Sequence, residues 1–162
     1  MVVRGADVTI TGSEFIGNRE GMTPEVAGVF LIGTSTHSIT INISETDFMS
    51  NGGFFQGTGL RLNLNEGDVA TVKDSTFRFH QATGGVRGGA MASTWELGHA
   101  SGEGHVRVLN TTFEDNFAPF GGGALGADAG TLEVINCTFT GNGGSAVDFR
   151  RTAHGMIANS RF

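Results

Sequence analysis

The sequence is poor in cysteine, proline and lysine. Its single cysteine, Cys137, excludes an internal disulfide and a cysteine-rich metal site, and we expect a small buried side chain there. With 2 prolines and 1 lysine beside 27 glycines and many Val, Ile, Phe, Thr and Asn residues, the composition favours strands and tight turns over helices. The sequence therefore predicts an all-β chain.

Long apolar runs and clustered positive charges are also lacking. The apolar runs span only a handful of residues, which predicts no transmembrane segment, and the first residues do not resemble a signal peptide. The net charge is −6 and only Arg150 and Arg151 stand together, so we expect no nucleic-acid partner. A length of 162 residues predicts a single domain, 1–162.

A repeated unit organises the whole chain. Phenylalanines recur two residues after a small polar residue and three residues after a residue that usually favours turns. Small or apolar residues seven and five positions before each phenylalanine predict a short strand with one face inward. The phenylalanines are Phe15, Phe48, Phe77, Phe113, Phe139 and Phe162, at spacings of 33, 29, 36, 26 and 23 residues.

A second repeated position lies three residues after each of the first five phenylalanines; we call the residues at one such equivalent position a column. Amide side chains at one position of stacked strands hydrogen-bond their copies in the next strand. We therefore expect structural ladders of phenylalanine and asparagine, with His80 as a hydrogen-bonding substitute. The column contains Asn18, Asn51, His80, Asn116 and Asn142.

The fold predicted by these columns is a right-handed parallel β-helix, a β-solenoid of about five full coils plus a partial sixth. The uneven spacings argue against a uniform left-handed hexapeptide helix. Each coil is expected to contain the strand before the phenylalanine and a second strand after a Gly or Ala. No cap is evident, so we expect a fragment of a longer solenoid or a subunit of a larger assembly.

The repeat also resembles a known family. Phe-x-x-Asn occurs at 15–18, 48–51, 113–116 and 139–142, and Gly-Gly-Ala-Met and Gly-Gly-Ala-Leu occur at 88–91 and 122–125. Over residues 6–162 this alternation is similar to the repeat of chlamydial-type polymorphic outer membrane proteins. The resemblance implies a right-handed β-helix of the kind found in surface-exposed adhesins, and an extracellular or cell-surface location.

Three residues support a catalytic alternative. Outward positions of neighbouring coils bring Asp128, Asp148 and Arg150 near the pattern of a polysaccharide lyase or epimerase, which uses carboxylates and a basic residue. A surface ion pair between adjacent coils explains the same residues more simply. The five histidines share no metal-ligand spacing, so we expect neither a metal nor a cofactor, and the sequence leans away from an enzyme.

Aromatic residues outside the repeat columns are better candidates for partner binding. Loop aromatics anchor proteins or sugars, or they fold over the solenoid as small clusters. These residues are Phe54, Phe55, Trp95, Phe117 and Phe120. We therefore expect a non-catalytic structural or adhesive module that contacts proteins or glycans, with a subunit of a larger complex or filament as another alternative.

Three Asn-x-Ser/Thr sequons are candidate N-glycosylation sites, at Asn42, Asn110 and Asn136. Asn110 and Asn136 also occupy the turn position of the repeat, so the backbone conformation alone accounts for an asparagine at both positions.

Overall fold

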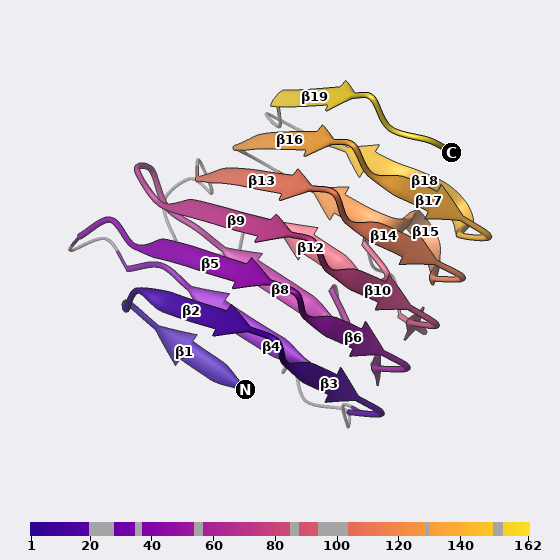
Figure 1. The fold of residues 1–162 in the computed structure, drawn as a ribbon, viewed down its shortest axis with the longest axis horizontal. Helices are drawn as coiled ribbons and strands as arrows, with labels where there is room; N and C mark the ends of the chain where they lie inside the picture. The colour runs from indigo at the N-terminus through magenta and orange to yellow at the C-terminus, as the bar shows by residue number, and fades with distance from the viewer. Residues whose placement is uncertain are drawn as a thin grey trace.

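The computed structural model describes residues 1–19, 28–34, 37–53, 57–84, 88–93, 104–128, 130–150 and 154–162. These residues form parallel strands stacked from β1 at one edge to β19 at the other (Figure 1). The strands divide among three sheets, which we call A, B and C.

Sheet A has eight strands: β1 (Val2–Arg4), β4 (Val29–Ile32), β7 (Gly52–Gly53), β8 (Leu60–Asn63), β11 (Gln81–Ala82), β12 (Met91–Ser93), β15 (Phe117–Ala127) and β18 (Gly143–Phe149). Sheet B has six: β2 (Val8–Thr11), β5 (Thr40–Ser44), β9 (Val69–Lys73), β13 (His105–Leu109), β16 (Thr131–Ile135) and β19 (His154–Ala158). Sheet C has five: β3 (Glu14–Ile16), β6 (Asp47–Met49), β10 (Thr76–Arg78), β14 (Thr112–Glu114) and β17 (Thr138–Thr140).

Two bends in each repeat separate these strands. The first lies at the turn position expected from the sequence, where the backbone is left-handed, with φ between 49° and 56°. Its residues are Gly12, Glu45, Asp74, Asn110, Asn136 and Asn159. The second lies two residues after the phenylalanine, with φ between 50° and 66°, at Gly17, Ser50, Phe79, Asp115 and Gly141. The first bend joins sheet B to sheet C, and the second joins sheet C to sheet A.

This topology contradicts the prediction of a single right-handed β-helix with two strands in each coil. The chain is all-β, but its strands belong to three separate parallel sheets. The physical reason is the pair of left-handed bends, which changes the direction of the backbone twice in a repeat and so places the strands before, between and after the bends in different sheets. Sheet A is also irregular, because β15 pairs with β18 through two shifts of register and also pairs with the short strand β11.

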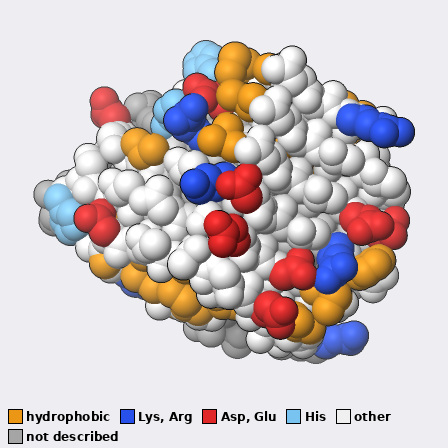
Figure 2. All heavy atoms as spheres, viewed as in Figure 1, with side chains coloured by type: hydrophobic (Ala, Val, Ile, Leu, Met, Phe, Trp, Pro, Cys, Tyr) orange, Lys and Arg blue, Asp and Glu red, His pale blue; other side chains and the backbone are white. Residues whose placement is uncertain are grey.

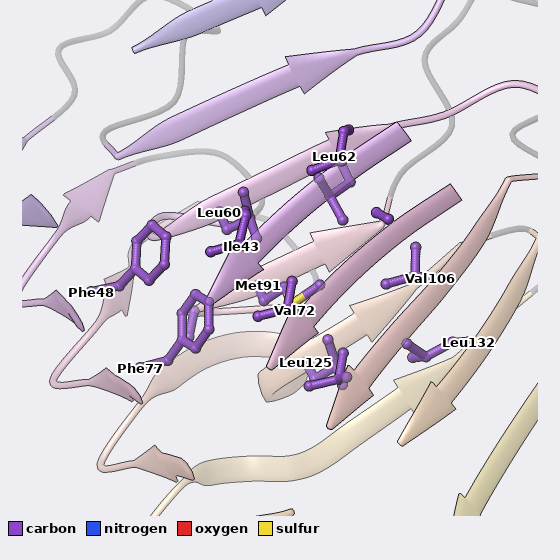
Figure 3. Packing of buried hydrophobic residues seen from close by; sticks show 14 of the residues in the cluster. Ile43, Phe48, Leu60, Leu62, Val72, Phe77, Met91, Val106, Leu125 and Leu132 are labelled. Carbon is purple, nitrogen blue, oxygen red and sulfur yellow. The ribbon is translucent and has the colours of Figure 1, made fainter. Parts of the chain in front are cut away.

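Sheets B and C keep a regular register along their lengths. Phe15, Phe48, Phe77, Phe113 and Phe139 are successive Cα partners in sheet C. Alternating residues of sheet B point inward, so Ile41, Val72, Val106 and Leu132 are buried. Figure 3 shows Val72, Val106 and Leu132 on the same side as Leu60, Met91 and Leu125 of sheet A, and together these residues form an apolar core between the sheets.

Cys137 belongs to this core, as the sequence predicted. Its Sγ lies 3.4 Å from the carbonyl oxygens of Val108 and Ile135. Burial raises the pKa of the Cys137 thiol, which keeps the sulfur in its neutral form.

Candidate functional site

The predicted phenylalanine ladder is a continuous stack of rings. Neighbouring ring centroids lie 4.5 to 5.1 Å apart from Phe15 to Phe162, and the planes differ by 3° to 11°. Figure 3 shows Phe48 and Phe77 lying face to face in the core. The closed packing on both faces of the central rings leaves no room for a ligand, so this ladder is part of the scaffold.

The asparagine column forms hydrogen bonds from repeat to repeat. Asn18 Nδ2 donates to Asn51 Oδ1, and Asn116 Nδ2 donates to Asn142 Oδ1, each at 2.9 Å. The same amides also donate to backbone: Asn51 Nδ2 lies 2.8 Å from the Phe15 oxygen, and Asn116 Nδ2 lies 3.0 Å from the Phe77 oxygen. These bonds satisfy polar groups inside the bend and fix its shape.

His80 interrupts this column and is fully buried. Its Nε2 lies 3.1 Å from the Phe48 oxygen, in the place of the amide-to-backbone bond made by the asparagines, and Nδ1 lies 3.1 Å from the Asn51 oxygen. Burial lowers the pKa of His80 from its ordinary value of 6.5 to about 4, although both backbone carbonyls favour the protonated ring. His80 is therefore neutral at physiological pH.

The three sequon asparagines lie in two different environments. Asn42 lies at the middle of β5 and is exposed on the outer face of sheet B. Asn110 and Asn136 occupy the first bend, where Asn136 Nδ2 donates to Asn110 Oδ1 at 3.3 Å and Asn110 Nδ2 donates to Asp74 Oδ1 at 3.0 Å. Asn42 is thus the only one of these three amides without a side-chain role at a bend.

The residues of the catalytic alternative lie on the outer face of sheet A. Asp148 and Arg150 form an ion pair with each other, and Arg150 Nη2 also donates to the Phe120 carbonyl at 2.9 Å. Asp128 is buried and has a partner of its own. The structure therefore pairs Asp148 with Arg150 within one stretch of the chain, and not between adjacent coils as the simpler explanation expected.

Much of this outer face is covered, which the sequence did not predict. Phe30 and Ile32 point outward from β4 and yet are buried, as is Arg61 on the next strand. The Arg61 guanidinium carbon lies 4.7 Å from the centre of the Phe30 ring, a cation–π contact. The alternation of side chains along a strand indicates which face of the sheet a residue occupies. It does not indicate whether other segments cover that face.

A shallow acidic groove follows the first bend, between sheets B and C. Its volume is about 350 Å³, and its lining includes the carboxylates of Glu14, Glu45, Asp47 and Asp74. Asp47 is paired with Arg78 at 2.8 Å. Figure 2 shows acidic side chains over this part of the surface. Among the described residues, no three His, Cys, Asp or Glu side chains are placed to hold a metal ion.

Exposed phenylalanines lie at the turn from sheet C into sheet A and at the start of the long strand β15 of sheet A. We call Phe79, Phe117 and Phe120 the aromatic corner; they are 46%, 46% and 65% exposed. Phe117 begins β15 and is the Cα partner of Gln81, two residues beyond Phe79. The Phe117 ring lies over Gly143, where a Cβ would collide with it. Phe54, Phe55 and Trp95, also predicted to bind partners, lie outside the described residues.

Phe79 was missed by the sequence analysis, although its environment is unusual. It occupies the second bend with φ 58°, where the other repeats have Gly, Ser or Asp. A bulky residue is strained in this conformation, at a cost of about 1–2 kcal/mol. The sequence does show a phenylalanine two residues after Phe77. Its unusual position could be recognised only once the second bend was known.

No protein-family model matches this sequence, and neither a curated protein nor a solved structure shows significant similarity to it. The class is therefore defined by architecture, as an all-β repeat protein with parallel strands. In the part of the chain that the structure describes, no helix has the length and apolar character needed to cross a bilayer.

Proposed function

We propose that this chain is a non-catalytic structural and adhesive module that contacts a protein or a glycan through the aromatic corner. The observation that carries the proposal is Phe79, which is exposed and held in a left-handed conformation that glycine or aspartate would adopt at lower cost. Because the left-handed conformation is costly for phenylalanine and the ring is 46% exposed, we assign its role to binding.

The surroundings of Phe79 support this assignment. Phe117 and Phe120 are also exposed, in the strand β15 that begins beside Gln81, and exposed aromatic side chains provide the anchors of many interfaces and the stacking surfaces for sugars. The hydrogen bond from Arg150 to the Phe120 carbonyl fixes the backbone below the ring. A rigid support lowers the entropy lost on binding. The resemblance to adhesin repeats adds to the adhesive part of the proposal.

The test is to measure binding of the labelled chain to a glycan array and to a panel of immobilised extracellular-matrix proteins. We expect specific binding in one of the two formats and at least a tenfold loss for the double variant Phe79→Ser and Phe120→Ser, because truncated aromatic anchors typically cost about 2 kcal/mol or more. Binding to the array alone would identify a glycan partner, and binding to the panel alone a protein partner.

The matched control is Val69→Ser, which removes an exposed apolar side chain from the outer face of sheet B. It should bind like the wild type. Equal binding by the wild type and the Phe79 and Phe120 variant would exclude the aromatic corner as the contact surface. Because both replaced side chains are exposed, loss of folding is not expected to explain a loss of binding, and circular dichroism verifies this.

A further inference from the structure

We infer that acid releases the partner of the aromatic corner, with His80 as the pH-sensitive anchor of this surface. The inference rests on the proposed function, because it assigns a means of regulation to the same contact surface. The observation behind it is the position of His80 between two residues of the aromatic corner. Phe79 is joined to His80 by the chain, and Phe117 is joined to it by a hydrogen bond.

Phe79 directly precedes His80, and its ring is exposed although His80 is fully buried. Its left-handed backbone, with φ 58°, is costly for phenylalanine and persists only where the surroundings fix it. Two hydrogen bonds contribute to this. The Phe79 N–H donates to the Glu114 carbonyl at 3.0 Å, and the His80 N–H donates to Asn116 Oδ1 at 3.1 Å. The placement of the Phe79 ring therefore depends on a bend that ends at His80.

Phe117 is tied to the same residue. Its N–H donates to the His80 carbonyl at 2.9 Å, and its neighbour Asn116 accepts the His80 N–H. Gln81, the residue after His80, is the Cα partner of Phe117. A displacement of His80 would therefore move both Phe79 and Phe117.

The His80 ring anchors this segment to the preceding repeat. Its two nitrogens each lie 3.1 Å from a carbonyl oxygen, of Phe48 and of Asn51. A neutral ring has one N–H, so it donates to only one of these carbonyls. The ring is closely packed, because a Cβ at Gly59 would lie 2.8 Å from its Cε1. The Phe77 ring borders it as well, at a centroid distance of 6.2 Å.

No charged side chain among the described residues compensates a positive charge on His80. The charged groups of the surrounding elements lie on the outer faces of sheets C and A or at the second bend, and none of them contributes to the pKa of His80. These groups are Asp47, Arg61, Arg78, Glu114 and Asp115. The two carbonyls favour the protonated ring, but burial outweighs them and lowers the pKa to about 4.

Protonation therefore favours an open state in which the ring contacts water. The pKa is about 4 for the buried ring and 6.5 for an exposed one, so the ring is held firmly above pH 6.5 and less firmly as the pH falls toward 4. Over this range the equilibrium shifts toward the open state by about a hundredfold. Opening removes the anchor of the strained Phe79 backbone and the bond from Phe117, so the surface loses its binding geometry.

Hydrogen exchange of the full chain, followed by mass spectrometry at about pH 7.5 and about pH 4.5, tests the opening without a partner. We expect the segments that contain Phe79 and Phe117 to lose protection at least tenfold in acid, after correction for the intrinsic effect of pH on exchange. The amides of Val106 and Val108 in sheet B should exchange later. Equal protection of both regions in acid would indicate global unfolding and overturn the inference.

Binding to the glycan array and to the matrix-protein panel at the same two pH values tests the release. We expect binding at least tenfold weaker in acid, with recovery on return to neutral pH. His80→Asn, which has the residue of the other repeats, should bind equally at both pH values and lack the localised exchange. The control His154→Asn removes an exposed histidine from sheet B and should keep the pH dependence of the wild type.

These two measurements separate the inference from the proposed function. Absence of binding at neutral pH would refute the proposed function, while localised exchange in acid would still establish the opening at His80. Binding at neutral pH that persists in acid would overturn the inference, as would an equal loss of binding in His80→Asn. Circular dichroism at both pH values verifies that the variants are folded, and the exchange of the wild type is decisive even if they are not.

Discussion

Replacing Phe77 with alanine is expected to lower the free energy of unfolding by about 3–5 kcal/mol, the range for a fully buried phenylalanine. The ring lies between those of Phe48 and Phe113, at centroid distances of 4.5 and 5.0 Å, and it is fully buried. Its removal would open a cavity in the middle of the ladder. Neighbouring rings cannot close this gap, because the strands on both sides fix their spacing.

Urea unfolding followed by circular dichroism measures this loss, and the chain provides a close control. Phe79→Ala removes the same side chain two residues away, from an exposed position, and should change the free energy of unfolding by no more than about 1 kcal/mol. Similar losses for the two variants would contradict the assignment of Phe77 to the core and Phe79 to the surface.

Acidification is expected to destabilise the fold through His80. Its pKa is about 4 in the folded chain and 6.5 when exposed, so the unfolded chain binds the proton more tightly. The stability that depends on the neutral ring is fully present above pH 6.5, declines as the pH falls, and is lost below about pH 4. A difference of this size corresponds to roughly 3 kcal/mol between the two limits.

The variant His80→Asn isolates this contribution. Asparagine is the residue of the other repeats in this column, and its amide can donate to the Phe48 carbonyl as Asn51 donates to that of Phe15. Urea unfolding at pH 7 and at pH 4 should therefore show a smaller loss of stability in His80→Asn than in the wild type. Equal losses would mean that other groups, and not His80, cause the acid sensitivity.

The side-chain columns could be predicted because each repeats one residue type at one position. The phenylalanine column and, apart from His80, the asparagine column are recognisable in this way, and the structure places the phenylalanines in register along sheet C. The first bend was recognisable because most of its residues favour turns. The second bend could not be found by the same approach. Its positions hold Gly17, Ser50, Phe79, Asp115 and Gly141, which share no chemical type and only one backbone conformation.

The division into three sheets follows from that bend, which explains why the predicted arrangement needed correction. Phe79, the central residue of the proposed contact surface, was harder to predict for a related reason. Phe79 stands out only when its φ of 58° and its exposure are known. The burial of Arg61 and Asp128 depends on contacts between segments distant in sequence, which strand alternation does not encode.

The ladders also determine how the stack would respond to force. Hydrogen bonds between repeats run along the stack, so a pull on its two ends would peel strands away one repeat at a time instead of shearing all of them together. Each detached repeat of 23 to 36 residues would release about 80–120 Å of extended chain. Stretching would therefore dissipate energy in small successive steps.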